Sequence, residues 1–192
     1  MLYSPFKTRQ TLVPAEQYPW SPVSDAEQWS LFENQPASPE VEVCRFLEAL
    51  VVLLKPNIIV ETGTGSASST ASMARGIRTN RRGLLFTYEL DVRKVEAAQL
   101  FLINERLYEY VTCYSHDTLS TSWPHDKPID LFFCDGADNR FAELKNFESH
   151  FHKDTIIVAH DAANPAHNWD LFPGYAKILF STPVGLLLMQ KI

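Results

Sequence analysis

Five short apolar segments in this chain each end at, or shortly before, an acidic side chain. Between them, apolar residues recur at the three- or four-residue spacing of amphipathic helices. This alternation predicts a parallel β-sheet covered by helices, because parallel strands need crossover connections and burial on both faces. The predicted strands are 57–61, 84–88, 111–114, 129–134 and 155–159.

Helical spacing is clearest over residues 41–54, which Pro39 precedes and Pro56 follows. Further helices are predicted at 68–78, 92–109 and 139–151. Two last apolar segments, 176–181 and 185–190, are too close together for a crossover helix and must form an antiparallel hairpin. The chain is therefore expected to be a doubly wound α/β domain, with a mostly parallel seven-stranded sheet and an antiparallel C-terminal hairpin strand.

Residues 1–40 have a different composition and hold six of the twelve prolines. Proline at this density disfavours regular helices and central strands. Aromatic residues such as Trp20 and Trp29 argue against a free disordered tail. We predict an irregular arm packed on a domain formed by residues 41–192. The arm either covers the ligand-binding face or completes the core, and it is a plausible contact of a homodimer.

The charge pattern disfavours a nucleic-acid partner, because the net charge is −6 and the one basic cluster is short. That cluster, Arg75, Arg78, Arg81 and Arg82, is expected to be a solvated surface. Three cysteines without metal-binding spacing suggest buried, reduced thiols. The sequence shows neither a signal-peptide pattern nor an apolar run long enough for a bilayer, so we expect a cytoplasmic protein without membrane contact.

Ligands of open parallel sheets bind beyond the carboxyl ends of the strands, where this chain gathers acidic residues. Carboxylates are costly to crowd together unless a cation or several donors fill the space between them. The acids expected at this edge are Glu61, Glu89, Asp117, Asp135 and Asp161.

The loop after the first strand contains Gly63 and Gly65, where the backbone can pass close to a ligand. Serines follow and can cap the next helix, whose amide end attracts an anion. At the end of the second strand, Glu89 could accept hydrogen bonds from both hydroxyls of a ribose. A glycine turn with an unrelated surface acid is the plain alternative, which the complete set of acids disfavours.

With these features, residues 40–192 resemble the class I S-adenosylmethionine-dependent methyltransferases, a Rossmann-like class distinguished by an antiparallel last strand. The resemblance implies that Gly63 and Gly65 form the cofactor loop. It also implies that Glu61 helps to hold the amino group of the methionine part, and that Ser69 holds its carboxylate.

The same resemblance assigns roles further along the chain. Glu89 would bind the ribose, Asp117 the adenine amine, and Asp135 would face the reacting methyl group. Ala67 stands where many relatives have a third glycine, which is a mild departure from the pattern.

The segments DLFFCDG and IIVAHD, around Asp135 and Asp161, resemble a subgroup of small-molecule O-methyltransferases. In its catechol- and caffeoyl-type members, the matches of Asp135 and Asp161 bind a divalent cation such as Mg²⁺, together with the next residue. Here that residue is Ala162, which has no ligand atom, although Asp138 or Asn164 could supply an oxygen. A bound metal is thus a possibility that the sequence leaves open.

The candidate catalytic residues are His160, Asp135 and Asp161. His160 is the best candidate for a general base, because imidazole titrates near neutrality and a hydroxyl acceptor must lose a proton. The alternative is a loop histidine hydrogen-bonded to Asp161. Three aromatic residues could wall an acceptor pocket or simply pack: Trp123, Trp169 and Phe172.

Together these features predict methyl transfer from S-adenosylmethionine to a small-molecule acceptor, most readily to a hydroxyl. The alternative is a catalytically silent methyltransferase fold that serves as a binding or scaffold subunit. A nicotinamide-dependent oxidoreductase would need glycine at Ser68. A nucleic-acid adenine methyltransferase would need a proline motif directly after Cys134, where the chain reads DGA.

Overall fold

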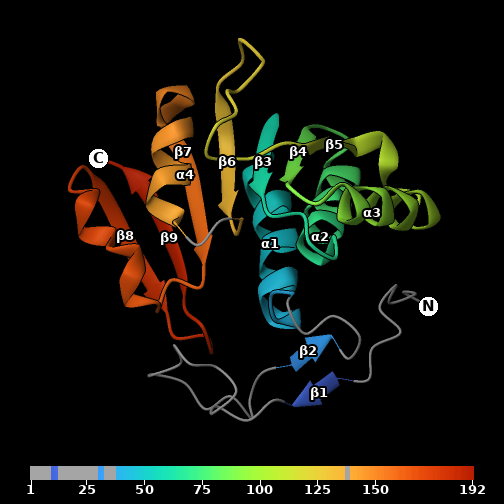
Figure 1. Ribbon diagram of the computed structural model, residues 1–192, viewed down its shortest axis with the longest axis horizontal. Helices are drawn as coiled ribbons and strands as arrows, with labels where there is room; N and C mark the ends of the chain where they lie inside the picture. Colours follow the sequence, from blue (N-terminus) through green and yellow to red (C-terminus); the bar gives the residue numbers. More distant parts are fainter. Residues whose placement is uncertain (1–9, 13–29, 33–37, 137–138) are drawn as a thin grey trace.

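The computed structural model describes residues 10–12, 30–32, 38–136 and 139–192. A seven-stranded sheet runs across the molecule with helices on both faces, and a small two-stranded sheet lies beside it (Figure 1). The helices are α1 (Val41–Leu54), α2 (Ser68–Asn80), α3 (Val92–Asn104) and α4 (Arg140–Phe147). Single 3-10 turns occupy Tyr108–Tyr110, Glu148–His150, Pro165–His167 and Trp169–Leu171.

The strands of the large sheet are β3 (Ile58–Thr62), β4 (Leu84–Glu89), β5 (Val111–Ser115), β6 (Ile129–Cys134), β7 (Phe151–His160), β8 (Tyr175–Phe180) and β9 (Leu186–Lys191). Their spatial order is β5-β4-β3-β6-β7-β9-β8. The first five strands are parallel to one another, whereas β9 pairs antiparallel with both β7 and β8. The predicted doubly wound sheet with its C-terminal hairpin is thus confirmed.

Two predicted helices end earlier in the structure than the sequence suggests. α3 stops at Asn104, and the chain turns at Arg106, whose φ angle of 56° is incompatible with a helix. α4 stops at Phe147, and β7 already begins at Phe151, where it pairs with Ile129 across a register shift. In both cases apolar residues continue at helical spacing beyond the last helical residue. The apolar pattern alone therefore could not locate the C-terminal end of the helix.

One face of the sheet is covered by α1, α2 and α3. Leu47 of α1, Met73 of α2 and Leu102 of α3 are fully buried in a cluster with Ile59 of β3 and Phe133 of β6. Arg75 on α2 is also buried, and it pairs with Glu48 of α1 at 3.2 Å. The prediction of a solvated Arg75 was therefore wrong, whereas Arg78, Arg81 and Arg82 are exposed.

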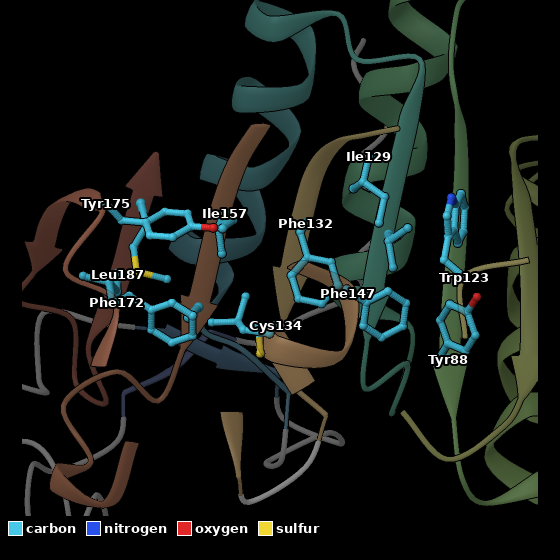
Figure 2. Packing of buried hydrophobic residues seen from close by; sticks show 14 of the residues in the cluster. Tyr88, Trp123, Ile129, Phe132, Cys134, Phe147, Ile157, Phe172, Tyr175 and Leu187 are labelled. Atoms are coloured by element: carbon cyan, nitrogen blue, oxygen red, sulfur yellow. The ribbon is translucent and has the colours of Figure 1, made fainter. Parts of the chain in front are cut away.

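The opposite face is covered by α4 and by loops. Figure 2 shows Phe132 of β6 beside Phe147 of α4, and their ring centroids are 5.2 Å apart. Trp123 and Phe172 belong to the same buried cluster, and Trp169 packs against it. All three aromatic residues thus pack in or against the core, and a further role as the wall of an acceptor pocket stays a prediction.

The small sheet consists of β1 (Gln10–Leu12) and β2 (Ser30–Phe32), which pair antiparallel. β2 contacts α1, and the small sheet lies at the end of the molecule where α1 begins (Figure 1). Most of the predicted arm, residues 1–40, lies outside the described residues. Among the described residues, no helix has the length and apolar character needed to cross a membrane.

Candidate active site

The cofactor loop predicted between β3 and α2 depends on glycine at its first turn. Gly63 has a φ angle of 83°, and a Cβ atom there would lie 2.2 Å from the backbone oxygen of Asp135. Only glycine lets this loop lie directly against the carboxyl end of β6. Gly63 also donates its N–H to the carbonyl oxygen of Tyr88 at 2.8 Å, so the loop is fixed to β4 as well.

Gly65 differs from Gly63, because a Cβ atom there would meet nothing within 4 Å. The backbone N–H of Gly65 donates to Oε2 of Glu89 at 3.0 Å. The other oxygen of Glu89 accepts from the N–H of Asp91 at 3.1 Å. A carboxylate offers about four acceptor positions, so half-buried Glu89 can still accept hydrogen bonds from a ligand in the open space beside Gly65.

Ala67 adopts the left-handed conformation, with a φ angle of 63°, directly before α2. Glycine adopts this conformation freely, whereas alanine does so at a cost of roughly 1 kcal/mol. The structure thus explains why glycine suits this position.

Glu61 and Ser69 lie together, but both face the protein interior. The Glu61 carboxylate is fully buried and accepts hydrogen bonds from the Ser69 hydroxyl at 2.5 Å and the Thr70 hydroxyl at 2.6 Å. Burial raises the pKa of Glu61 to about 7, although the two hydroxyls lower it. In this arrangement Glu61 fixes the start of α2 to β3, and the predicted contacts of both residues with the methionine part stay predictions.

The serines after Gly65 do not cap α2 as predicted, because Ala67 is its N-cap and no side chain makes a cap hydrogen bond. Ser66 and Ser68 instead form a small hydrogen-bonded cluster with Ser38, which the sequence did not single out. Ser38, just before α1, bonds to the hydroxyl of Ser66, and Ser66 bonds to Ser68 at 2.9 Å. Ser38 and Ser68 are buried. The chain segment before α1 is therefore part of the wall of the predicted cofactor site.

Asp117 lies beyond the end of β5, at the same edge of the sheet as Glu89, but its side chain is exposed. Its carboxylate accepts from the N–H of Leu119 at 2.9 Å and from the Ser120 hydroxyl at 3.2 Å, which shapes its own turn. The N–H of His116 donates to the carbonyl oxygen of Glu89 at 3.1 Å and joins the two strand ends. The contact of Asp117 with the adenine amine stays a prediction.

The three predicted catalytic residues lie together at the ends of β6 and β7. Nδ1 of His160 is 3.3 Å from Oδ1 of Asp135 and 3.5 Å from Oδ1 of Asp161. Asp161 has a φ angle of 57°, a left-handed conformation that is sparsely populated outside glycine.

Two residues that sequence reasoning missed complete this cluster. Arg140 donates from Nη2 to Asp135 at 2.9 Å and to Asp161 at 2.7 Å. Nε2 of His160 lies 2.9 Å from the Glu40 carboxylate, which is buried at the start of α1. Arg140 follows Asp135 by only five residues at the start of a predicted helix, and this proximity was the one available signal. Nothing in the sequence links Glu40 to His160.

The surroundings of His160 affect its predicted role as a base. Burial lowers the pKa of His160, but the carboxylates of Asp135 and Glu40 outweigh it and raise the pKa well above the ordinary value. The raised pKa favours the imidazolium form of His160, and an imidazolium ion cannot accept a proton. The contacts of His160 favour an electrostatic role over that of a base.

Glu143 is a further functional candidate that the sequence analysis did not name. It is fully buried on α4 and accepts hydrogen bonds from the hydroxyl of Thr118 at 2.5 Å and of Thr62 at 3.3 Å. Nη1 of Arg140 is 4.0 Å away. A glutamate on an ordinary amphipathic helix gives no sequence signal for such burial, which depends on how α4 packs against β6.

The metal ligands predicted from the sequence are only partly assembled. Among the described residues, Asp135, His160 and Asp161 bring their ligand atoms within 4.8 Å of one another. Ala162 is buried and offers no ligand atom, and Asn164 uses its side-chain oxygen to accept from the N–H of Ala166. Asp138 lies outside the described residues.

A family model described as "Methyltransferase domain" matches residues 60–162, from β3 to the loop after β7. The chain belongs to this methyltransferase family. The match covers more than half of the chain, and it includes the glycine loop and all three predicted catalytic residues. No curated protein sequence matches the chain.

Solved structures share the fold of this methyltransferase. A methyltransferase from Geobacter sulfurreducens is 20% identical, with a TM-score of 0.70 over 83% of this chain and 84% of that one. The Bacillus cereus O-methyltransferase in complex with SAH is 17% identical, with a TM-score of 0.67 over 83% and 85%. TomG, the Streptomyces achromogenes O-methyltransferase involved in tomaymycin synthesis, was solved with SAM and is 17% identical, with a TM-score of 0.67 over 81% and 82%.

Proposed function

We propose that this methyltransferase binds S-adenosylmethionine and transfers its methyl group to a hydroxyl of a small molecule. The observation that carries the proposal is the arrangement of Gly65 and Glu89, which leave open space beside a carboxylate that can still accept hydrogen bonds. Similar folds that were solved with SAM or SAH support the choice of cofactor.

The charge of the residues at the edge of the sheet also supports this cofactor. Among the described residues, Asp135, Asp161, Glu40 and Glu143 pair with two basic side chains, Arg140 and His160. The excess negative charge suits a positively charged ligand. S-adenosylmethionine supplies a methyl group on a cationic sulfonium, and Glu89 would hold its ribose.

The contribution of the protein to such a reaction is mainly alignment. Positioning two reactants for an in-line displacement can lower a barrier by about 7–11 kcal/mol in well-oriented cases. In this proposal Asp135 lies nearest the transferred methyl group, and His160 and Arg140 hold Asp135 in place. If activity instead rises with pH as His160 loses its proton, the result would support the predicted role of His160 as a base.

The cofactor part of the proposal can be tested by calorimetric titration with S-adenosylmethionine. We expect wild-type protein to bind, and Glu89→Ala to weaken binding by about 10–100-fold, because a hydrogen bond to a charged group contributes about 1.5–3 kcal/mol. Glu96→Ala, an exposed glutamate on α3, is the matched control and should bind like wild type. No binding by wild type would reject the proposed cofactor.

A second candidate, a binding or scaffold subunit without turnover, is favoured by one observation. Each of the three predicted catalytic side chains is paired with a charged group of the protein itself. Incubation with S-adenosylmethionine and a panel of phenols and alcohols separates the two candidates. Formation of S-adenosylhomocysteine with any acceptor supports the enzyme, whereas tight binding without product over the whole panel supports the subunit.

The proposal also includes features that rest on the sequence alone. Residues 41–192 would form the methyltransferase domain, and residues 1–40 an arm that covers the site or joins a second copy as a homodimer. A cytoplasmic location and a small molecule in place of nucleic acid as the acceptor complete it. Sedimentation of the chain with and without residues 1–37 tests the role of the arm in a dimer.

A further inference from the structure

Arg140 occupies the space between the two carboxylates that a catalytic metal ion would need. Its Nη2 atom contacts Oδ1 of Asp135 and Oδ2 of Asp161 at 2.9 and 2.7 Å. The whole residue is 5% exposed. An arginine at the first residue of a helix faces the positive end of the helix dipole, which is locally unfavourable. The carboxylates therefore account for its position.

The residues around this point do not fit a divalent cation. Such an ion needs several oxygen ligands at about 2.0–2.6 Å, and it would lie against the guanidinium group that both carboxylates already contact. Each ring nitrogen of His160 already lies against a carboxylate, Nδ1 against Asp135 and Nε2 against Glu40. Ala162, which follows Asp161, offers no ligand atom, and among the described residues the cluster of possible side-chain ligands contains only Asp135, His160 and Asp161.

We infer that Arg140 is the resident cation of this site, and that its guanidinium takes the place of a divalent metal ion between Asp135 and Asp161. The two carboxylates then accept hydrogen bonds from a fixed, planar donor, which suits arginine better than lysine. A buried guanidinium cannot coordinate an acceptor oxygen as a metal ion does. It follows, resting on the proposed function, that the acceptor need not carry two neighbouring oxygens for chelation.

Titration with Mn²⁺, followed by electron paramagnetic resonance, tests the inference on the protein without substrate. We expect wild-type protein to leave the signal of free Mn²⁺ unchanged. Arg140→Ala should gain a site that binds Mn²⁺ at least about tenfold more tightly than wild type. The double variant Arg140→Ala/Asp161→Asn should lose this gain. Arg93→Ala, which frees the exposed Asp91 in the same way, is the matched control and should gain nothing.

A chemical rescue separates the charge of Arg140 from a structural role. Ethylguanidinium should enter the space left in Arg140→Ala and displace Mn²⁺, whereas ethylammonium at the same concentration should displace it less. A folded Arg140→Ala variant that gains no Mn²⁺ site would overturn the inference.

The wild-type titration decides the question even if Arg140→Ala does not fold. Stoichiometric binding of Mn²⁺ to wild type, lost in Asp161→Asn, would overturn the inference. Calorimetric binding of S-adenosylmethionine to wild type, with EDTA and with Mg²⁺, tests the cofactor separately. Equal binding in both supports the inference, and a requirement for Mg²⁺ contradicts it. No binding in either condition would reject the proposed function and leave the Mn²⁺ result to decide on Arg140.

Discussion

Nε2 of His160 lies 2.9 Å from Oε2 of Glu40, although 120 residues separate the two in sequence. Glu40 is the residue before α1 and is 1% exposed. The contact ties the chain segment that precedes α1 to the end of β7. His160 also lies against Asp135. Removing the charge of either carboxylate should therefore change the electrostatic environment of the other, because both contact the same imidazole ring.

Replacing Glu40 by glutamine should lower the pKa of His160, because the removed charge is one of the two that raise it. The protein should lose about 2 kcal/mol of stability, since hydrogen bonds to charged groups contribute about 1.5–3 kcal/mol. NMR titration of the imidazole and urea denaturation measure the two effects. Glu96→Gln is the exposed control. An unchanged His160 pKa in Glu40→Gln would show that the contact does not persist in solution.

The two glycines of the predicted cofactor loop should respond differently to alanine. Gly63→Ala forces a backbone shift against Asp135 and should destabilise the fold by about 3 kcal/mol or more. Gly65→Ala should cost only about 1 kcal/mol, for its positive φ angle, because open space surrounds it.

Gly65→Ala, the variant with the smaller loss of stability, should nevertheless lose cofactor affinity. A cofactor lying against Gly65 would meet the new methyl group, so its affinity should fall at least about tenfold in Gly65→Ala. Urea denaturation and calorimetric titration of both variants provide the comparison. Full cofactor affinity in Gly65→Ala would mean that the ligand does not approach this turn.

Glu61 should make stability depend on pH. Its pKa rises from an ordinary 4.5 to about 7 in the folded chain, so the native state holds the proton more tightly than the unfolded chain does. The resulting stabilisation is complete below the unfolded pKa and is lost as pH rises through about 7. A shift of this size corresponds to about 3 kcal/mol.

Glu61→Gln removes this titration and retains a hydrogen-bonding side chain. The difference in unfolding free energy between wild type and Glu61→Gln should therefore shift against wild type as pH rises from about 4.5 to about 7. Urea denaturation at several pH values measures it. A constant difference across this range would contradict the raised pKa.

The cysteines should be poorly reactive in the folded chain. Burial, with Glu61 nearby, raises the pKa of Cys113 to about 11, and burial raises those of Cys44 and Cys134 as well. Only the thiolate reacts readily. We expect an aromatic disulfide reagent to label half-buried Cys113 slowly and the other two only on unfolding. Cys113→Ser should abolish the slow native reaction, and rapid labelling of two thiols would contradict this.

The fold could be predicted because local pattern and topology agree. Strands such as 129–134 are short, apolar and flanked by turns, and the three residues between the last two segments leave room only for a hairpin. Helix ends were harder to place. The turn at Arg106 depends on a single left-handed residue, and the early start of β7 at Phe151 depends on pairing with Ile129.

The residues that meet at the edge of the sheet were predicted where they follow strand ends and missed where their position depends on packing. Asp135, His160 and Asp161 directly follow predicted strands, so topology alone brings them together. Arg140 and Glu143 reach the site from a helix, and Glu40 reaches it from before α1. No spacing rule connects these residues to the strand ends, because their side chains meet only once both layers have packed on the sheet.

The pairing of β9 with β7 continues past the strands themselves. The N–H groups of Ala162 and Ala163 donate to the carbonyl oxygens of Gly185 and Val184, each at 2.9 Å. The backbone that follows His160 and Asp161 is thus hydrogen-bonded to residues that lie more than twenty positions later in the sequence and are translated after it. On a translating ribosome, the last carboxylates of the site would stay unanchored until this hairpin has left the exit tunnel, so a nascent chain can hold most of its sheet and still lack a working site.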